Sequence, residues 1–279
     1  MLLQRVITAA VGIPIIVGIT LLGGIAFVIV AAAILAIAAL EYCAATDPSR
    51  SQASATPSTG PAALLRQRLP ALLAAAAAGS LAVAAREGFD ELTGALALGI
   101  TVLFVPMILR GDPEEGLRDW ARAVPAVAYI GFLGAHLVLL RDLGGDGKWV
   151  FLAVLGTWST DTFSYFAGRA LGRHHPVPNI SPGKTDAGFI AGYAGGFASI
   201  IALDLVLDLP MSTVEAALLG LLFPAAAMIG DLAESLIKRG AGVKDTSELI
   251  PGHGGFLDRL DSILFTAPLV YYFVIWAVN

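Results

Sequence analysis

Four polar side chains fall on one face of a segment that is otherwise apolar. In chain order they are Asp231, Glu234, Ser235 and Lys238, at positions i, i+3, i+4 and i+7. Residues with this spacing share one face of a helix. Since a charge in the hydrocarbon of a membrane costs about 2.5 to 3.5 kcal/mol on insertion scales, this face must meet water, a partner charge or a metal ion. The alternative interpretation is a row of ion pairs at a helix end, without a part in chemistry.

A second pair of carboxylates opens the last apolar segment. Asp258 and Asp261 are three residues apart, so a helix would place both on one face, with Arg259 beside them. Carboxylate oxygens are the hard ligands that Mg²⁺ prefers, and the ion commonly takes one or two of them together with waters and substrate phosphates. Because only about twenty residues separate the two helices, we expect Asp231 and Asp258 to converge on one Mg²⁺. An acid that interacts favourably with the helix dipole is the alternative role for Asp258.

The loop between these helices combines glycines with cations. It contains Asp245 and the run PGHGG from Pro251 to Gly255. Glycine lets the backbone take positive φ and approach a phosphate closely, and the N-terminus of a following helix favours anions. The cations in and around the loop are Lys238, Arg239, Lys244 and Arg259. The pattern predicts a phosphate-binding loop, with a plain glycine-rich connection as the alternative.

A further acidic position lies inside another apolar segment. Asp161, in STDTFSYFAGRALG, is a candidate metal ligand, and the alternative is a structural aspartate satisfied by neighbouring Ser and Thr. The loop that follows contains ISPGKT, which ends at Thr185. Its GKT is not a P-loop, because Pro178 stands where that motif requires a glycine and there is no βαβ context. The adjacent His174 and His175 are interpreted as a solvated turn.

The elements that must position these residues are membrane helices. Of the 279 residues, 57% are hydrophobic and 14% are charged, the mean hydropathy is +0.78, and several apolar runs reach the roughly 20 residues that cross a bilayer. About a quarter of the charged residues fall between Asp231 and Asp261. The sequence therefore predicts an all-α, polytopic integral membrane protein. Its single cysteine, Cys43, excludes an intramolecular disulfide.

Hydropathy predicts about nine transmembrane helices. They lie near residues 6–22, 25–45, 67–85, 92–109, 121–140, 149–170, 187–208, 213–237 and 259–277. The turn at Gly23 and Gly24 is so short that the first two helices must form an antiparallel hairpin. The predicted division is into N-terminal scaffold helices, residues 1–140, and a C-terminal catalytic region, residues 141–279. The Ser- and Pro-rich connector from Asp47 to Pro61 is assigned no chemistry.

The distribution of cations sets the predicted orientation. With nine helices and the amino terminus in the cytoplasm, fourteen Lys and Arg residues lie in cytoplasmic segments or helix ends, and three lie outside. The polar loops 169–186 and 238–258 then face the cytoplasm, where nucleotides are. We expect a protein of the cytoplasmic (inner) membrane whose active site faces the cytoplasm. The net charge of −5 says little about partners, and no nucleic-acid partner is expected.

The segment SLIKRGAGVKDTSELIPGHGGFLDRLD, from Ser235 to Asp261, resembles the signature of the phosphatidate cytidylyltransferase (CDP-diacylglycerol synthase) family at every fixed position. DTFSYFAGRALGRHH and ISPGKT resemble another motif region of that family, so the resemblance runs from about Thr157 to Asp261. There is one departure. Where the family usually continues ISPGKT with Trp-Glu-Gly, this chain has Asp186, Ala187 and Gly188. We expect Asp186 to cap the seventh helix rather than to act in catalysis.

The resemblance implies the reaction CTP + phosphatidate → CDP-diacylglycerol + pyrophosphate with Mg²⁺, and it leaves a second cation open. Phosphatidate is already an anionic nucleophile, so the main task is to neutralise charge. The expected metal ligands are Asp161, Asp231 and Asp258. The expected catalytic residues are Lys238, Arg239, Lys244, Asp245, His253, Arg259 and Asp261, and the expected substrate-binding residues are Ser181, Lys184, Thr185, Ser235, Gly254 and Gly255. CTP, phosphatidate and the lipid bilayer are the expected partners, and a homodimer is one assembly state left open.

Two other functions fit parts of the pattern. A CTP-dependent lipid kinase would share the topology, the metal and the nucleotide, but its acceptor would be an alcohol that attacks the terminal phosphate. A transporter of an anionic solute would need polar residues near the midplane of several helices. The first five predicted helices offer little beyond Glu41 and His136, both near helix ends.

Overall fold

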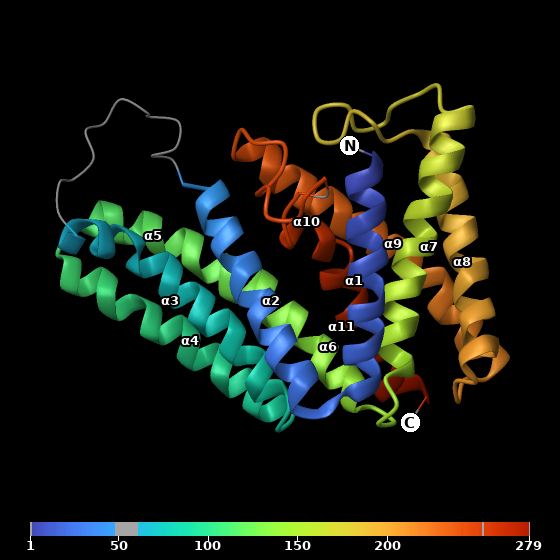
Figure 1. Cartoon of the computed structure of the whole chain (residues 1–279), viewed down its shortest axis with the longest axis horizontal. Coiled ribbons are helices and arrows are strands. Elements are labelled where there is room, and N and C mark those ends of the chain that lie inside the picture. Colours follow the sequence, from blue (N-terminus) through green and yellow to red (C-terminus); the bar gives the residue numbers. More distant parts are fainter. Residues whose placement is uncertain (1, 48–60, 253, 279) are drawn as a thin grey trace. The chain divides into compact units, whose positions relative to one another are not determined.

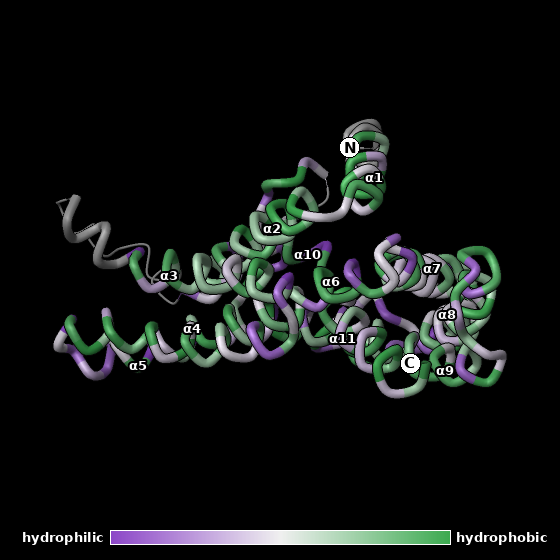
Figure 2. The backbone as a smooth tube through the Cα atoms, turned by 90° about the horizontal axis from the view of Figure 1, so that it is seen from below, coloured by the Kyte–Doolittle hydropathy of each residue, from purple (hydrophilic) through white to green (hydrophobic). Residues whose placement is uncertain are grey.

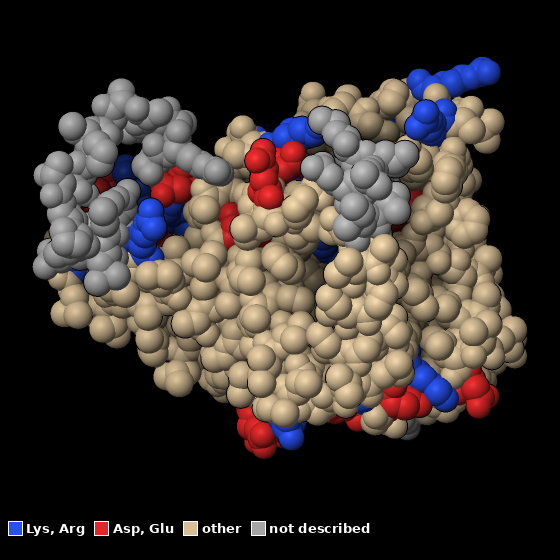
Figure 3. Space-filling model, in the orientation of Figure 1, with Lys and Arg blue, Asp and Glu red and all other residues tan. Residues whose placement is uncertain are grey.

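The computed structural model describes residues 2–47, 61–252 and 254–278, and within these ranges the chain forms helices and connecting loops without a strand (Figure 1). The helices are hydrophobic over most of their length, and hydrophilic residues gather at helix ends and in connections (Figure 2). On the face shown in Figure 3, the charged side chains likewise lie toward the ends of helices. These features confirm the predicted all-α membrane architecture.

Seven helices within the described ranges are long and apolar enough to cross a membrane. They span Gly24–Ala45, Arg68–Ala85, Phe89–Arg110, Pro113–Asp142, Asp186–Leu207, Thr213–Gly240 and Leu257–Val278. The two other predicted spans, near 6–22 and 149–170, also coincide with helices. The count of nine membrane spans stays a prediction, as does the side of the membrane on which each end lies.

The chain forms two compact units. The first comprises residues 1–139 and 240–259, and the second comprises residues 140–239 and 260–279. The loop that follows Arg239 therefore groups with the N-terminal helices. The assignment of scaffold and catalytic roles to residues 1–140 and 141–279 stays a prediction.

In the first unit, the turn between the first two helices consists of Gly23 and Gly24, which both have positive φ, 58° and 53°. Glycine takes this conformation at little cost, and the two helices run in opposite directions, as predicted (Figure 1). A Cβ atom on Gly131, in the π-helix η2 (Ala126–Phe132), would lie 2.7 Å from the Cα of Ala78 in α3 (Pro61–Ala85). This π-helix therefore packs directly on the backbone of α3. The elements are α1 (Leu2–Leu22), α2 (Gly24–Ala45), α3 (Pro61–Ala85), α4 (Phe89–Arg110), α5 (Pro113–Pro125), the π-helix η2 (Ala126–Phe132) and α6 (Leu133–Asp142).

In the second unit, a row of buried glycines lets α8 (Asp186–Leu207) pack closely on α7 (Lys148–Leu171). Gly188, Gly192 and Gly196 form this row, and a Cβ atom on Gly192 would lie 1.9 Å from Oγ of Ser164. Pro224 of α9 contacts the same row at Gly196. The packing fixes the three helices together. The elements are α7 (Lys148–Leu171), α8 (Asp186–Leu207), α9 (Thr213–Gly240), α11 (Ile263–Phe273) and the π-helix η3 (Val274–Val278). The one-turn helix α10 (Leu257–Leu260), which precedes α11, belongs to the first unit except for Leu260.

The last predicted helix, 259–277, coincides with the apolar span Leu257–Val278, but a short turn interrupts this span. It is broken at Asp261 and Ser262, between α10 and α11. Oδ1 of Asp261 accepts a hydrogen bond from the backbone N–H of Ser262 at 2.6 Å, and such a local bond competes with the helical ladder. Asp258 and Asp261 therefore do not share one regular helix. Within the second unit, α9 approaches the break closely, since a Cβ atom on Gly230 would lie 2.7 Å from the carbonyl oxygen of Asp261.

Candidate functional site

An ion pair in the second unit joins two of the predicted motif regions. Nζ of Lys184, from the ISPGKT loop, lies 2.7 Å from Oδ2 of Asp231 on α9. Both side chains are largely shielded, with 27% and 22% of their surface exposed. The position of Lys184 follows from its loop, because the chain turns between Ser181 and Lys184 and α8 begins two residues after the lysine. The pair brings a predicted substrate-binding residue and a predicted metal ligand together.

Two further carboxylates act on the same lysine. Burial alone would lower the pKa of Lys184, but the neighbouring charges of Asp231, Asp161 and Asp261 outweigh it, so the pKa lies above its ordinary value of 10.5. Lys184 is thus positively charged at neutral pH. The stabilisation from this pairing is fully present below the ordinary value and is lost only as the pH rises through the raised one. Asp161 from α7, Asp231 from α9 and Asp261 before α11 thus all act electrostatically on the ammonium of Lys184.

The remaining polar residues of the α9 face extend this group by one turn. Glu234 is buried, and its Oε2 lies 2.5 Å from Nζ of Lys238. Nε of Arg239 donates to the carbonyl oxygen of Ile180 at 3.3 Å, which ties the end of α9 to the ISPGKT loop. Ser235 is half-buried on the same helix. The four residues lie on one helix at the predicted spacing. For Glu234 and Lys238, which form an ion pair, the alternative interpretation of this face as a row of ion pairs fits well.

The glycine-rich loop lies in the first unit and is organised by Asp258. This side chain is 6% exposed, and its Oδ2 accepts three hydrogen bonds, from the backbone N–H of Thr246 at 3.1 Å, its hydroxyl at 2.9 Å and the backbone N–H of Gly255 at 2.7 Å. A backbone bond from Ile250 to Gly254 closes the loop at 2.8 Å. Asp258 therefore holds the two ends of the loop together.

The other predicted residues of this loop are exposed or form its turn. Lys244, Asp245 and Arg259 are exposed. Gly254 has a φ of 82°, as expected for a glycine-dependent turn. His253 lies outside the described residues. Asp231 and Asp258 belong to different units, so their convergence on one ion stays a prediction.

Thr185, not Asp186, is the N-cap of α8, so the predicted cap is wrong by one residue. The Oγ1 of Thr185 accepts from the backbone N–H of Gly188 at 3.2 Å, and Thr185 has the extended backbone of a cap. Asp186 is the first helical residue, and its Oδ2 lies 2.6 Å from Nδ1 of His174. His174 and His175 are exposed, as predicted, and Nδ1 of His175 donates to the carbonyl oxygen of Lys184 at 3.1 Å.

We expect Thr185→Ala to lower the free energy of unfolding by about 0.5 to 2 kcal/mol, because it removes the cap. Asp186→Asn should leave stability and turnover nearly unchanged, since the exposed pair with His174 is worth about 1 kcal/mol at most. Thermal unfolding and kcat in one detergent measure both. A large loss of kcat in folded Asp186→Asn would instead show that the carboxylate charge acts in catalysis.

Glu41 is the main residue that the sequence interpretation passed over. It is 4% exposed in α2, and it accepts hydrogen bonds from Ser247, Phe256 and Leu257 of the glycine-rich loop. The available signal was the presence of a carboxylate within an otherwise apolar helix, which the cost of burying a charge makes informative. Its position near the end of the predicted span concealed that signal.

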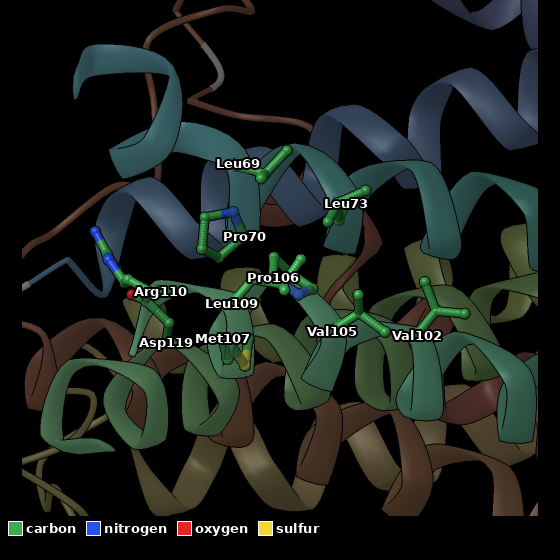
Figure 4. Close-up of a pocket in the computed structure, with 10 residues that line it drawn as sticks. All are labelled: Leu69, Pro70, Leu73, Val102, Val105, Pro106, Met107, Leu109, Arg110 and Asp119. Atoms are coloured by element: carbon green, nitrogen blue, oxygen red, sulfur yellow. The ribbon is translucent and has the colours of Figure 1, made fainter. Parts of the chain in front are cut away.

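The first unit also contains an apolar cavity of about 420 Å³ between α3 and α4 (Figure 4). Its lining is mainly Leu, Val, Pro and Met side chains, and the ion pair of Arg110 with Asp119 lies at one end. None of the predicted site residues lines it.

The donor chemistry for a magnesium ion is present in the second unit. Among the described residues, no group of three or more His, Cys, Asp and Glu is arranged to hold a metal ion by itself. Mg²⁺ commonly needs fewer protein ligands, since waters and phosphate oxygens complete its shell. Asp161, Asp231 and Asp261 bring three negative charges to the one cation of Lys184. The predicted binding of Mg²⁺ by these carboxylates stays a prediction.

Comparison with known proteins finds similarity along nearly the whole chain. Residues 3–276 match the model of the Cytidylyltransferase family. A phosphatidate cytidylyltransferase of Synechocystis is 33% identical over 98% of this chain and 96% of its own length. One of Bacillus subtilis is 36% identical over 53% of this chain and 55% of its own, and a chloroplastic one of Arabidopsis thaliana is 41% identical over 47% and 34%.

Proposed function

Since this chain belongs to the cytidylyltransferase family, we propose that it is a phosphatidate cytidylyltransferase, which makes CDP-diacylglycerol and pyrophosphate from CTP and phosphatidate. The observation that carries the proposal is the pairing of Lys184 with Asp231, with Asp161 and Asp261 acting on the same ammonium. Asp161, Lys184 and Asp261 come one each from the three motif segments that carry the family resemblance, and Asp231 lies four residues before the third of these segments. The membrane helices supply the environment that a lipid substrate requires.

The chemistry is a displacement at phosphorus. An oxygen of the phosphatidate phosphate attacks the α-phosphorus of CTP, the bond from that phosphorus to the bridging oxygen breaks, and pyrophosphate leaves with the electron pair. The nucleophile needs no strong base, so the barrier lies in bringing two anions together and in stabilising the leaving group. Residues that neutralise and orient the phosphates are therefore the ones that catalysis needs.

We assign that task in the second unit to Lys184 and its neighbours. Lys184 stays cationic at neutral pH and can contact a phosphate oxygen, with Asp231 orienting its ammonium. Arg239 is exposed and tied to the same loop, so its guanidinium can also meet the triphosphate. Asp161 and Asp231 would hold Mg²⁺, with Asp261 as a further candidate in this unit and Asp258 as the third ligand that the sequence predicts. The bound ion would supply further neutralisation of the phosphates.

Labelled CTP tests the proposed reaction directly. Purified protein would be incubated with phosphatidate, Mg²⁺ and CTP labelled at the α-phosphorus. The expected result is label in CDP-diacylglycerol and unlabelled pyrophosphate. A CTP-dependent lipid kinase would leave the α-label in the released CDP and would require an alcohol acceptor, and a transporter would release no pyrophosphate. Either of those outcomes would overturn the proposal.

We also propose that the glycine-rich loop faces the cytoplasm. The start of α1 and the end of α2 both contact this loop, through Thr8 to Pro251 at 3.2 Å and through Glu41, so these three segments lie on one side. The fourteen-to-three distribution of cations favours the cytoplasm for that side.

A cysteine at exposed Glu248, in a Cys43→Ser background, should therefore resist a membrane-impermeant thiol reagent added to intact cells. A cysteine at exposed Asp146, in a connection predicted to lie outside, is the matched control and should react. Measurement of the labelled fraction by mass shift checks both. Labelling at Glu248 but not at Asp146 would reverse the orientation.

A further inference from the structure

Three groups near the far end of the sequence donate hydrogen bonds to the carboxylate of Glu41. Oε1 accepts from the hydroxyl of Ser247 at 2.5 Å and from the backbone N–H of Phe256 at 3.1 Å. Oε2 accepts from the backbone N–H of Leu257 at 2.8 Å. These donors are 206 to 216 residues away in the chain. A single buried side chain of α2 thus holds both ends of the glycine-rich loop.

The loop is shaped to fit around this carboxylate. A Cβ atom on Gly255 would lie 2.5 Å from Oε2 of Glu41 and 2.6 Å from the hydroxyl of Thr246, so any larger residue would have to displace these side chains. On its other side, Gly255 donates its backbone N–H to Asp258. Two carboxylates therefore hold one short segment, Asp258 from within the segment and Glu41 from α2. Asp258 and Glu41 together set the positions of the exposed residues Lys244 and Arg259, which flank this segment.

We propose that Glu41 is a positioning residue for the transferase reaction, which fixes the glycine-rich loop in its active conformation without contacting the substrate. This inference rests on the proposed function, because it assigns the loop to the reacting phosphates. The signature motifs of the family lie between about Thr157 and Asp261 and so do not include α2, and Glu41 is assigned its role from these contacts. The arrangement depends on the carboxylate form of Glu41. A carboxylate offers hydrogen-bond acceptors on both oxygens, and here each oxygen meets a donor.

The replacement of Glu41 by glutamine tests this role. Glutamine keeps the shape, but it presents an amide NH₂ to at least one of the three donors and so loses a hydrogen bond to a charged group. We expect kcat/KM to fall about tenfold or more, with the Tm little changed. Glu248→Gln is the matched control, because it is the same substitution at an exposed site in the same loop and should retain wild-type kinetics.

Coupling between Glu41 and the loop separates positioning from general stability. Ser247→Ala removes one donor and should lower kcat/KM by itself, but it should lower it much less in the Glu41→Gln background. Hydrogen exchange should also become faster at the amides of Phe256 and Leu257 in Glu41→Gln, and not in Glu248→Gln. If Glu41→Gln fails to fold, the exchange and kinetics of Ser247→Ala carry the same test.

Wild-type kinetics from Glu41→Gln, or losses from Glu41→Gln and Ser247→Ala that simply multiply, would overturn the inference. Failure of the proposed function is a different result. In that case wild-type protein forms no CDP-diacylglycerol, while exchange at Phe256 and Leu257 still reports whether Glu41 holds the loop.

Discussion

Asp231→Asn is expected to lower kcat by about 10² to 10³ at saturating CTP and phosphatidate, in protein that remains folded in the membrane. The substitution keeps the shape of the side chain and removes its charge. Lys184 then loses the partner at 2.7 Å that orients its ammonium, and the group with Asp161 and Asp261 loses one of its three negative charges. Product formation from labelled CTP, at several Mg²⁺ concentrations, measures the effect.

The matched control for this variant is Asp208→Asn. Asp208 is an exposed aspartate of the same unit, it lies between α8 and α9, and its φ of 50° suits asparagine equally well. It should retain wild-type kinetics. Lys184→Met, made in both backgrounds, tests the pairing: its effect should be large in the wild type and small beside Asp231→Asn. Near-normal turnover of Asp231→Asn with Mg²⁺ would remove this residue from the site.

Asp258→Asn and Asp258→Ala together form the second test with a large expected effect. Asparagine can turn its amide oxygen toward Thr246 and Gly255 and so keep the three accepted hydrogen bonds without the charge. Alanine removes the acceptor and releases the loop. We expect both variants to lose about 10²-fold or more in kcat, because the sequence predicts that the charge itself binds Mg²⁺.

Hydrogen exchange at Thr246 and Gly255 should distinguish the two variants, with protection retained in Asp258→Asn and lost in Asp258→Ala. This comparison separates a metal ligand from a residue that only organises the loop. If Asp258→Asn stayed within a few-fold of wild type while Asp258→Ala was inactive, the role of Asp258 would be confined to its hydrogen bonds, and the predicted metal ligand would be wrong.

The helices were predictable because the hydropathy of a membrane helix is a local property of about twenty residues. Each expected range coincides with one helix or with a run of consecutive helices, and the hairpin at Gly23 and Gly24 followed from the shortness of the connection. The break at Asp261 was missed because it depends on one side chain that bonds the next backbone N–H. Hydropathy does not register such a bond.

The same holds for the site: its local features could be predicted from the sequence, and its contacts between distant residues could not. The helical face with Asp231 and Lys238 could be read from spacing alone. The pairing of Lys184 with Asp231, and the capture of three loop donors by Glu41, join positions far apart in the chain. One sequence gives residue types and local periodicity, and it contains no direct record of which distant side chains meet. The capping role of Thr185 could not be read from the sequence, because it depends on where α8 begins. Its predicted role in substrate binding stays a prediction.

The separation between Glu41 and its donors sets an order of events during synthesis. Leu257 is made 216 residues after Glu41, which at ribosomal speed is roughly 10 to 40 s later. During that interval α2 contains a carboxylate whose three later partners do not yet exist. The nascent chain must therefore keep the end of α2 in contact with water or lipid headgroups until its last helix arrives. Chains that stop before Ser247 should retain this defect permanently, which makes them natural targets for membrane quality control.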